Sequence, residues 1–225
     1  MSEDIYKIRV NLSRLADVRP HDVELRELSP YVMPGKLEMI LGGLIWRAEE
    51  LARNAFDLLM KKDFVTSAII TRALMETAGC LVLIHNLVNK SIEKGLSASF
   101  DSKINKLLFG SILWEDLDKP IHVNDMLREV QKVIPDYFDV HYASLSEYAH
   151  PNWLGTFGAY GTTHKEETAV SFSDHGASAE RQHGTILGRL SGTIVLCLGY
   201  HEMVREMMGD FVKSVDIFYA VRPEI

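Results

Sequence analysis

The spacing of apolar side chains predicts that most of this chain is helical. From residue 36 to about residue 62, apolar residues recur three and four positions apart, which is the spacing of one face of an α-helix. A second helix is expected over residues 64–94, where Asp63 can cap its start and Gly95 can end it. Its middle, residues 69–88, is apolar on nearly every side. This helix should therefore lie at the centre of the fold.

The same spacing continues through the rest of the chain. Three shorter helices are expected, over residues 97–109, 123–133 and 135–150. Gly110 can end the first of them, and Pro151 must stop the last. A long final helix should begin near residue 177 and reach residue 208 or beyond. The tail from residue 210 should add more helix as far as Pro223.

Two segments depart from this helical pattern. Residues 1–35 contain three prolines and cannot form one long helix, because proline lacks a backbone N–H and restricts the residue before it. We expect an arm with one or two short helical turns there. Residues 153–160 and 168–172 are rich in aromatic and β-branched side chains, which predicts a two-stranded hairpin. Because an isolated hairpin is marginally stable, it should pack on the helical body or on a partner chain.

Together these elements predict a mainly α protein. We expect an antiparallel helical bundle of four to six helices, with a small β-hairpin near residues 153–173. The N-terminal arm, residues 1–35, should precede a single bundle domain over residues 36–225, into which the hairpin of residues 153–175 is inserted. A chain of 225 residues can bury about 70% of the surface that it exposes when unfolded. It therefore needs neither a metal nor a disulfide to fold.

Composition and charge narrow the functional classes. The chain has 24 Lys and Arg against 31 Asp and Glu, and the resulting net charge of −7 disfavours broad binding to DNA, RNA or anionic lipid. No basic segment followed by an apolar run opens the sequence, and no apolar run reaches the roughly 18 to 20 residues of a membrane span. Cys80 and Cys197 lie in apolar windows, where we expect buried free thiols. We therefore expect a cytoplasmic protein that does not bind membranes.

Arg72 and Glu76 interrupt the apolar central helix. They are four residues apart, so their side chains share a face and can pair. A charged group on a buried helix is costly unless it is paired. The pair could be an ion pair that fixes the register of the helix, or it could be the floor of a ligand site or active site.

The expected helix over residues 135–150 carries the densest cluster of polar side chains. Tyr142, Ser146 and His150 follow one another at four-residue steps and form one stripe. His150 ends the helix, where the helix dipole favours a protonated imidazole. His150 could act as a general acid or base beside Tyr142 and Ser146, or it could build the turn out of the helix with Pro151 and Asn152. Glu147 and Asn152 join Tyr142 and Ser146 as candidate binding residues.

The histidines do not indicate a metal site. The chain has nine of them, but they are scattered and form no His-Glu-x-x-His motif, and the two cysteines form no Cys-x-x-Cys motif. His141 and His150 project from opposite sides of their expected helix, so they cannot share one ion. We expect neither a metal nor another cofactor.

Two strings of residues resemble a family of uncharacterised bacterial helical proteins. They are Arg72-Ala73-Leu74-Met75-Glu76 and Tyr142-Ala143-Ser144-Leu145-Ser146-Glu147-Tyr148-Ala149-His150-Pro151-Asn152, within a likeness that covers roughly residues 40–160. That family in turn resembles the HEPN superfamily, helical bundles found in toxins, ribonucleases and antiviral systems. The resemblance implies a mainly antiparallel bundle of four to five helices that pairs with a second copy. HEPN ribonucleases place four to six residues between an arginine and a histidine, a spacing that only Arg14 and His21 satisfy here, outside the expected bundle helices.

The sequence leaves two functions open. The first is a noncatalytic HEPN-like module that acts by homo-oligomerisation or by binding a partner or small ligand. The second is a metal-independent hydrolase or ribonuclease acting on RNA or a nucleotide. In that enzyme Arg72 would neutralise phosphate, His150 would be the acid or base, and Ser146 and Tyr142 would orient the substrate. Glu76 is a further candidate catalytic residue. A closed hydrogen-bonded cluster would favour the module, and a solvent-connected cleft reaching Arg72 and His150 would favour the enzyme.

Overall fold

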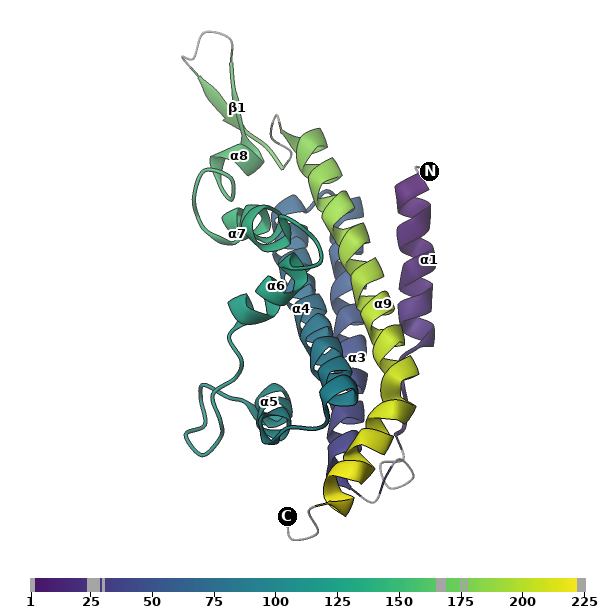
Figure 1. Cartoon of the computed structure of the whole chain (residues 1–225). Helices are drawn as coiled ribbons and strands as arrows, with labels where there is room; N and C mark the ends of the chain where they lie inside the picture. Colours follow the sequence, from purple (N-terminus) through teal and green to yellow (C-terminus); the bar gives the residue numbers. More distant parts are fainter. Residues whose placement is uncertain are drawn as a thin grey trace.

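A single apolar helix forms the centre of the fold. The computed structural model describes residues 3–23, 29, 31–164, 169–174, 176 and 178–221. The central helix is α4 (Phe64–Lys94), and α3 (Val32–Met60) and α9 (Ala179–Ala220) run along it (Figure 1). The prediction of a mainly α fold with a small two-stranded sheet is confirmed.

The burial of α4 matches its apolar composition. Its fully buried side chains include Leu74, Leu81 and Ile84, so neighbouring helices cover it on several sides, as the sequence predicts. By length and composition alone, α4 is also long and apolar enough to cross a membrane. However, 67% of its most apolar window is buried inside the fold, which is the situation of a core helix in a soluble protein.

The N-terminal segment differs from the expected arm. Helix α1 (Glu3–Asp17) has 15 residues, buries Ile8 and Leu15, and packs against α9 and α3. The expectation of one or two helical turns is wrong because the first proline, Pro20, follows the helix instead of interrupting it. Pro34 lies in the first turn of α3, where the missing N–H has no intrahelical partner to lose. Pro30 lies outside the described residues.

A short helix and a longer composite one cover the other side of α4, and another short helix packs against α3. Helices α5 (Ala98–Phe109) and α6 (Val123–Gln131) match their expected ranges closely. The expected helix over residues 135–150 is divided into a π-helical turn, η1 (Tyr137–Tyr142), and α7 (Ala143–Ala149). The helical segment begins after Asp136, not at Pro135 as expected. The φ of Asp136 is 64°, which is left-handed, so Asp136 cannot belong to a right-handed helix. His150 has extended backbone and ends α7, as predicted from Pro151.

The hairpin is shorter than expected and begins later. Strand β1 (Gly161–Thr163) pairs antiparallel with β2 (Val170–Phe172), and Gly161 lies opposite Phe172. The expected strand over residues 153–160 is wrong, since this segment forms turns and the short helix α8 (Phe157–Tyr160). The side-chain oxygen of Asn152 accepts hydrogen bonds from the backbone N–H groups of Leu154 and Gly155, at 3.1 and 3.3 Å. These bonds turn the chain back before it can extend.

Helix α9 unites the long final helix and the expected helical tail. It runs unbroken for 42 residues, and near its C-terminal end Phe211 is fully buried against Phe100 of α5, with ring centroids 5.2 Å apart. The expected stop at Pro223 lies outside the described residues. The two cysteines are buried free thiols, as predicted: Cys80 on α4 and Cys197 on α9. Both therefore pack as small apolar side chains.

Candidate functional site

The charged pair on α4 meets a tyrosine from η1. The Tyr142 hydroxyl donates a 2.7 Å hydrogen bond to Glu76 Oε1, and Arg72 Nη2 lies 3.6 Å from the same oxygen. The Arg72 guanidinium also lies over the Tyr142 ring, 4.9 Å from its centroid. The predicted pairing of Arg72 with Glu76 is confirmed, and Tyr142, which is 66 residues beyond Glu76, completes the group.

The environment of Tyr142 keeps its hydroxyl protonated. Burial raises the pKa of Tyr142 to about 12, and the hydrogen bond to Glu76 and the charge of that carboxylate act in the same direction, while Arg72 opposes them. At neutral pH the phenol is therefore a stable donor to the carboxylate. The interaction ties η1 to α4 and fixes the orientation of the Glu76 side chain.

The other predicted residues form a separate cluster at the end of α7. His150 is exposed, and its imidazole makes no hydrogen bond or ion pair with any residue in the described ranges. Ser146 donates to the Tyr142 carbonyl at 3.0 Å, and Asn152 donates to Glu147 at 2.5 Å. A Cβ at Gly155 would lie 2.3 Å from the His150 carbonyl oxygen, so only glycine fits this close turn. These contacts build the exit from α7.

The structure therefore separates the two halves of the predicted site. Arg72, Glu76 and Tyr142 are together, whereas His150 lies eight residues beyond Tyr142, about 12 Å along a helix. No contact within the described part of the chain joins His150 to Arg72. The side chains of Ser146 and Asn152 form hydrogen bonds with nearby backbone groups and with Glu147.

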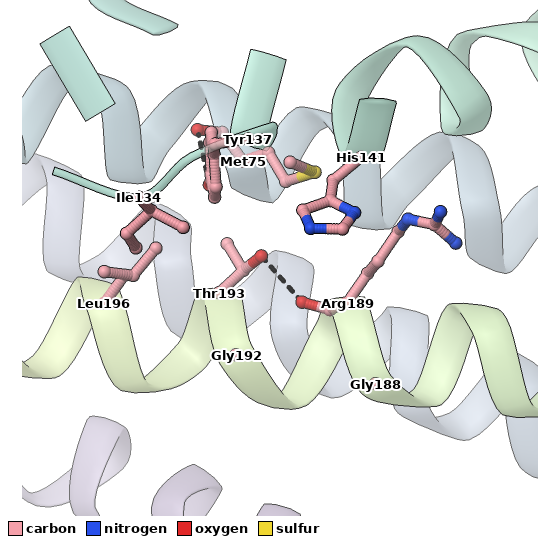
Figure 2. Close-up of a pocket in the computed structure, with 9 residues that line it drawn as sticks. All are labelled: Met75, Ile134, Tyr137, His141, Gly188, Arg189, Gly192, Thr193 and Leu196. Carbon is pink, nitrogen blue, oxygen red and sulfur yellow. Dashed lines mark hydrogen bonds between the residues drawn. The ribbon is translucent and has the colours of Figure 1, made fainter. Parts of the chain in front are cut away.

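A groove that the sequence did not predict lies between α4, η1 and α9 (Figure 2). Its cavity has a volume of about 250 Å³, and we call it the α9 groove. Most of its lining is apolar, from Met75 of α4, Ile134 and Leu196. Its polar lining includes His141 of η1 and Arg189 of α9, both labelled in Figure 2.

Two nitrogen atoms of residues that line the α9 groove lack hydrogen-bond partners among the described residues. Nδ1 of His141 and Nε of Arg189 are buried without a hydrogen-bond partner among the described residues. The guanidinium of Arg189 bonds only to the Thr185 carbonyl of its own helix, at 3.4 Å, and forms no ion pair within the described ranges. Burial lowers the pKa of Arg189. A half-buried cation without a carboxylate is costly, so this position favours a bound acceptor.

The remaining polar side chains of the groove are already satisfied. The Tyr137 hydroxyl donates to the Met75 carbonyl at 3.5 Å, and the Thr193 hydroxyl donates to the Arg189 carbonyl at 2.7 Å. Burial also raises the pKa of Tyr137, so its hydroxyl stays neutral. His141 and Arg189 are therefore the two groups that a ligand in this groove would meet with unused hydrogen-bonding capacity.

Two glycines keep the α9 groove open. A Cβ built at Gly188 or Gly192 would meet nothing within 4 Å, and both residues line the groove. Gly184, one turn earlier on α9, is equally open but does not line it. Glycine costs a helix interior about 1 kcal/mol relative to alanine. Its use at these positions leaves space that a larger side chain would fill.

Sequence reasoning noticed His141 but gave it no site role, and it missed Arg189. The available signal was the one that identified Arg72: a charged residue inside an apolar stretch of helix, here between Gly188 and Leu190. The sequence could not show that His141 lines the same groove, because His141 is 48 positions away from Arg189. Among the described residues, no three His, Cys, Asp or Glu side chains gather closely enough to hold a metal ion.

The contact between Tyr142 and Glu76 predicts a pH dependence. The hydroxyl of Tyr142 should lose its proton near pH 12, and Glu76→Gln should lower this pKa because it removes the carboxylate charge that opposes a tyrosinate. The folded pKa is above the value of about 10 expected for an unfolded tyrosine. The contribution of protonated Tyr142 to the free energy of unfolding is therefore complete below about pH 10 and is lost as the pH rises toward 12.

This titration can be followed by NMR of tyrosine labelled at the ring carbon that carries the hydroxyl. The variant Tyr142→Phe identifies the signal. A Tyr142 signal that titrates near pH 10 in the wild type would contradict the contact.

Comparison with known proteins gives no match. No protein-family model, no curated protein and no solved structure matches the chain. The assignment of a function therefore depends on the geometry of the described residues: a tied group around Glu76, and an open apolar groove that contains an unpaired arginine.

Proposed function

We propose that the protein is a noncatalytic HEPN-like helical module that binds a small ligand in the α9 groove and pairs with a second copy. One observation carries the ligand-binding part: Arg189, a half-buried cation without a carboxylate partner among the described residues, lines a mostly apolar groove together with His141. Binding sites for small molecules commonly combine apolar walls with a few polar groups that fix orientation. The acidic net charge and the buried free thiols suit a reducing, cytoplasmic location.

The groove defines the chemistry of its ligand. A volume of about 250 Å³ lies just below the roughly 300 to 1,000 Å³ of drug-sized sites, so a molecule of about one ring fits best. The planar guanidinium of Arg189 can donate hydrogen bonds to both oxygens of a carboxylate, and His141 can add a further donor. We therefore propose a small organic acid with an apolar or aromatic body.

Benzoate is the probe that tests this proposal. It should bind to the wild type and shift the backbone amide signals of Gly188, Gly192 and Thr193 in NMR spectra. Arg189→Gln should weaken binding about tenfold, which is the loss of one charge-assisted hydrogen-bonded pair. Gly192→Leu should abolish binding, because Gly192 lines the groove, a Cβ there meets nothing within 4 Å, and a leucine side chain would occupy the space of the ligand.

Gly184→Leu is the matched control, since Gly184 is an open glycine of the same helix outside the groove. Both leucine variants should keep or raise the free energy of unfolding, by up to about 1 kcal/mol, because leucine is the better helix former. A loss of binding in Gly192→Leu alone therefore reports on the groove. Equal benzoate affinity in the two leucine variants would overturn the proposed site.

A second candidate, a metal-independent ribonuclease or nucleotide hydrolase, is favoured by one specific observation. His141 and Arg189 line the same groove, so an imidazole and a guanidinium lie together although no bundle helix carries the HEPN spacing of these residue types. In this enzyme His141 would be the acid or base and Arg189 would neutralise phosphate. These roles would replace those expected for His150 and Arg72.

RNA cleavage distinguishes the two functions. We expect the wild type to leave a single-stranded RNA oligonucleotide intact in the presence of EDTA, because a module needs no catalytic step. Cleavage that disappears in His141→Asn, with an unchanged melting temperature, would instead establish the enzyme. His150→Ala is the matched control, since His150 is exposed and outside the groove.

Pairing with a second copy is supported by an exposed apolar loop between α5 and α6. The side chains of Ile112, Leu113 and Trp114 are 85%, 82% and 68% exposed, and they are consecutive. Contiguous apolar surface of this kind marks interaction sites more often than a scattered apolar residue does. A second copy would remove these three side chains from water.

Light scattering coupled to size-exclusion chromatography should show a homodimer at micromolar concentration. The double variant Leu113→Ser and Trp114→Ser should be monomeric, because it removes most of the apolar surface of the loop. Ile217→Ser is the control: Ile217 is 67% exposed on α9, far along the chain from this loop. A wild type that stays monomeric would contradict the pairing.

A further inference from the structure

A second cavity, of about 250 Å³, lies between α3, α4, α5 and α6. We call it the α5 cavity. Its apolar side includes Leu107 of α5 and Met126 of α6, and its α4 side includes Glu76 and Thr77. It is separate from the α9 groove, with which it shares no lining residue.

Two cations from different helices line the α5 cavity. They are Arg47 of α3 and Lys106 of α5, and within the described part of the chain neither forms an ion pair with a carboxylate. Elsewhere on α3 the basic residues Lys36 and Arg53 are both paired with carboxylates.

The guanidinium of Arg47 is held in place from one side. Its Nε donates to Thr77 Oγ1 at 3.2 Å, and the Thr77 hydroxyl in turn donates to the Ala73 carbonyl at 3.1 Å. The two terminal nitrogens of Arg47 make no hydrogen bond with any residue of the described ranges. A guanidinium fixed through Nε keeps these nitrogens free for two oxygens of one anion.

The carboxylate that lines the α5 cavity does not balance these two charges. Glu76 accepts from Tyr142 at 2.7 Å and lies 3.6 Å from Arg72, so its charge is already offset by a third cation. The thiol of Cys80, which also lines the cavity, stays neutral because burial raises its pKa to about 12. The lining therefore holds two uncompensated positive charges.

We infer that the α5 cavity binds a small phosphomonoester, with its phosphate between Arg47 and Lys106 and its apolar body against Leu107 and Met126. A phosphate carries close to two negative charges at neutral pH and so matches two cations, whereas a carboxylate would leave one of them uncompensated. The forked donors of Arg47 suit phosphate oxygens, and Lys106 adds a point charge. This inference does not rest on the function proposed for the α9 groove.

Phenyl phosphate at low ionic strength tests the inference, with calorimetry for affinity and NMR for location. It should shift the amide signals of Thr77, Leu107 and Gly110, and it should bind at least about tenfold more tightly than inorganic phosphate because its ring buries apolar surface. Gly192→Leu, which blocks the α9 groove, should leave this affinity unchanged. Binding at the α5 cavity and binding at the α9 groove are therefore tested separately.

Charge variants locate the phosphate. Arg47→Gln and Lys106→Gln should each weaken phenyl phosphate binding about tenfold, and Arg47→Lys should lie between wild type and Arg47→Gln because it keeps the charge but loses the fork. Lys103→Gln is the matched control, since Lys103 is an exposed cation of α5 outside the cavity. It should bind as the wild type does.

Glu76→Gln should strengthen binding severalfold, because it removes a negative charge from the cavity wall. A gain in affinity cannot come from loss of the fold, so this variant separates electrostatics from destabilisation. The inference is overturned if phenyl phosphate does not bind the wild type. It is equally overturned if Arg47→Gln and Lys106→Gln bind phenyl phosphate with wild-type affinity.

Discussion

The burial of α4 is the constraint on which the rest of the structure depends. A helix that is apolar on nearly every side must be covered on several sides, and in this chain α3, α9, α6 and α7 supply the cover. The buried polar side chains of α4 then need partners, and Ser67, Thr71 and Ser91 find them in backbone carbonyls. Arg72 and Glu76 pair with each other and with Tyr142, and Thr77 bonds to Arg47 and to its own helix. Of these residues, Glu76 and Thr77 line the α5 cavity.

The short segment η1 connects the two cavities. His141 faces the α9 groove, while Tyr142, the next residue, bonds to Glu76, which lines the α5 cavity. This π-helical segment therefore lines the α9 groove and holds one wall residue of the α5 cavity, and π-helical turns are frequent at functional positions. The two cavities have different characters. The α9 groove is apolar with one shielded cation, whereas the α5 cavity presents two cations that share no carboxylate of their own.

Charged side chains elsewhere in the fold differ from the cations that line the two cavities. Two carboxylates of α3 are buried, and both are paired: Glu38 with Arg205 of α9, and Glu49 with Arg19 and Arg53. These pairs join helices and leave no buried charge uncompensated, as stability requires. Each of these three arginines is thus paired with an acid. Arg189 and Arg47, which lack acidic partners among the described residues, both line cavities. Unpaired cations at cavities are the feature that favours anion binding.

The sequence by itself determined most of the helices after residue 31, because helix periodicity depends on residues only three or four positions apart. It also determined the central place of α4, the pairing of Arg72 with Glu76 across one helical turn, and the end of α7 before Pro151. It misjudged residues 153–160, where bonds from the Asn152 side chain overrode strand propensity. Only the tertiary structure decided that Tyr142 reaches Glu76, that His141 and Arg189 line one groove, and that Arg47 and Lys106 share a cavity. These meetings depend on how distant helices are rotated and shifted against one another, and no local pattern records that.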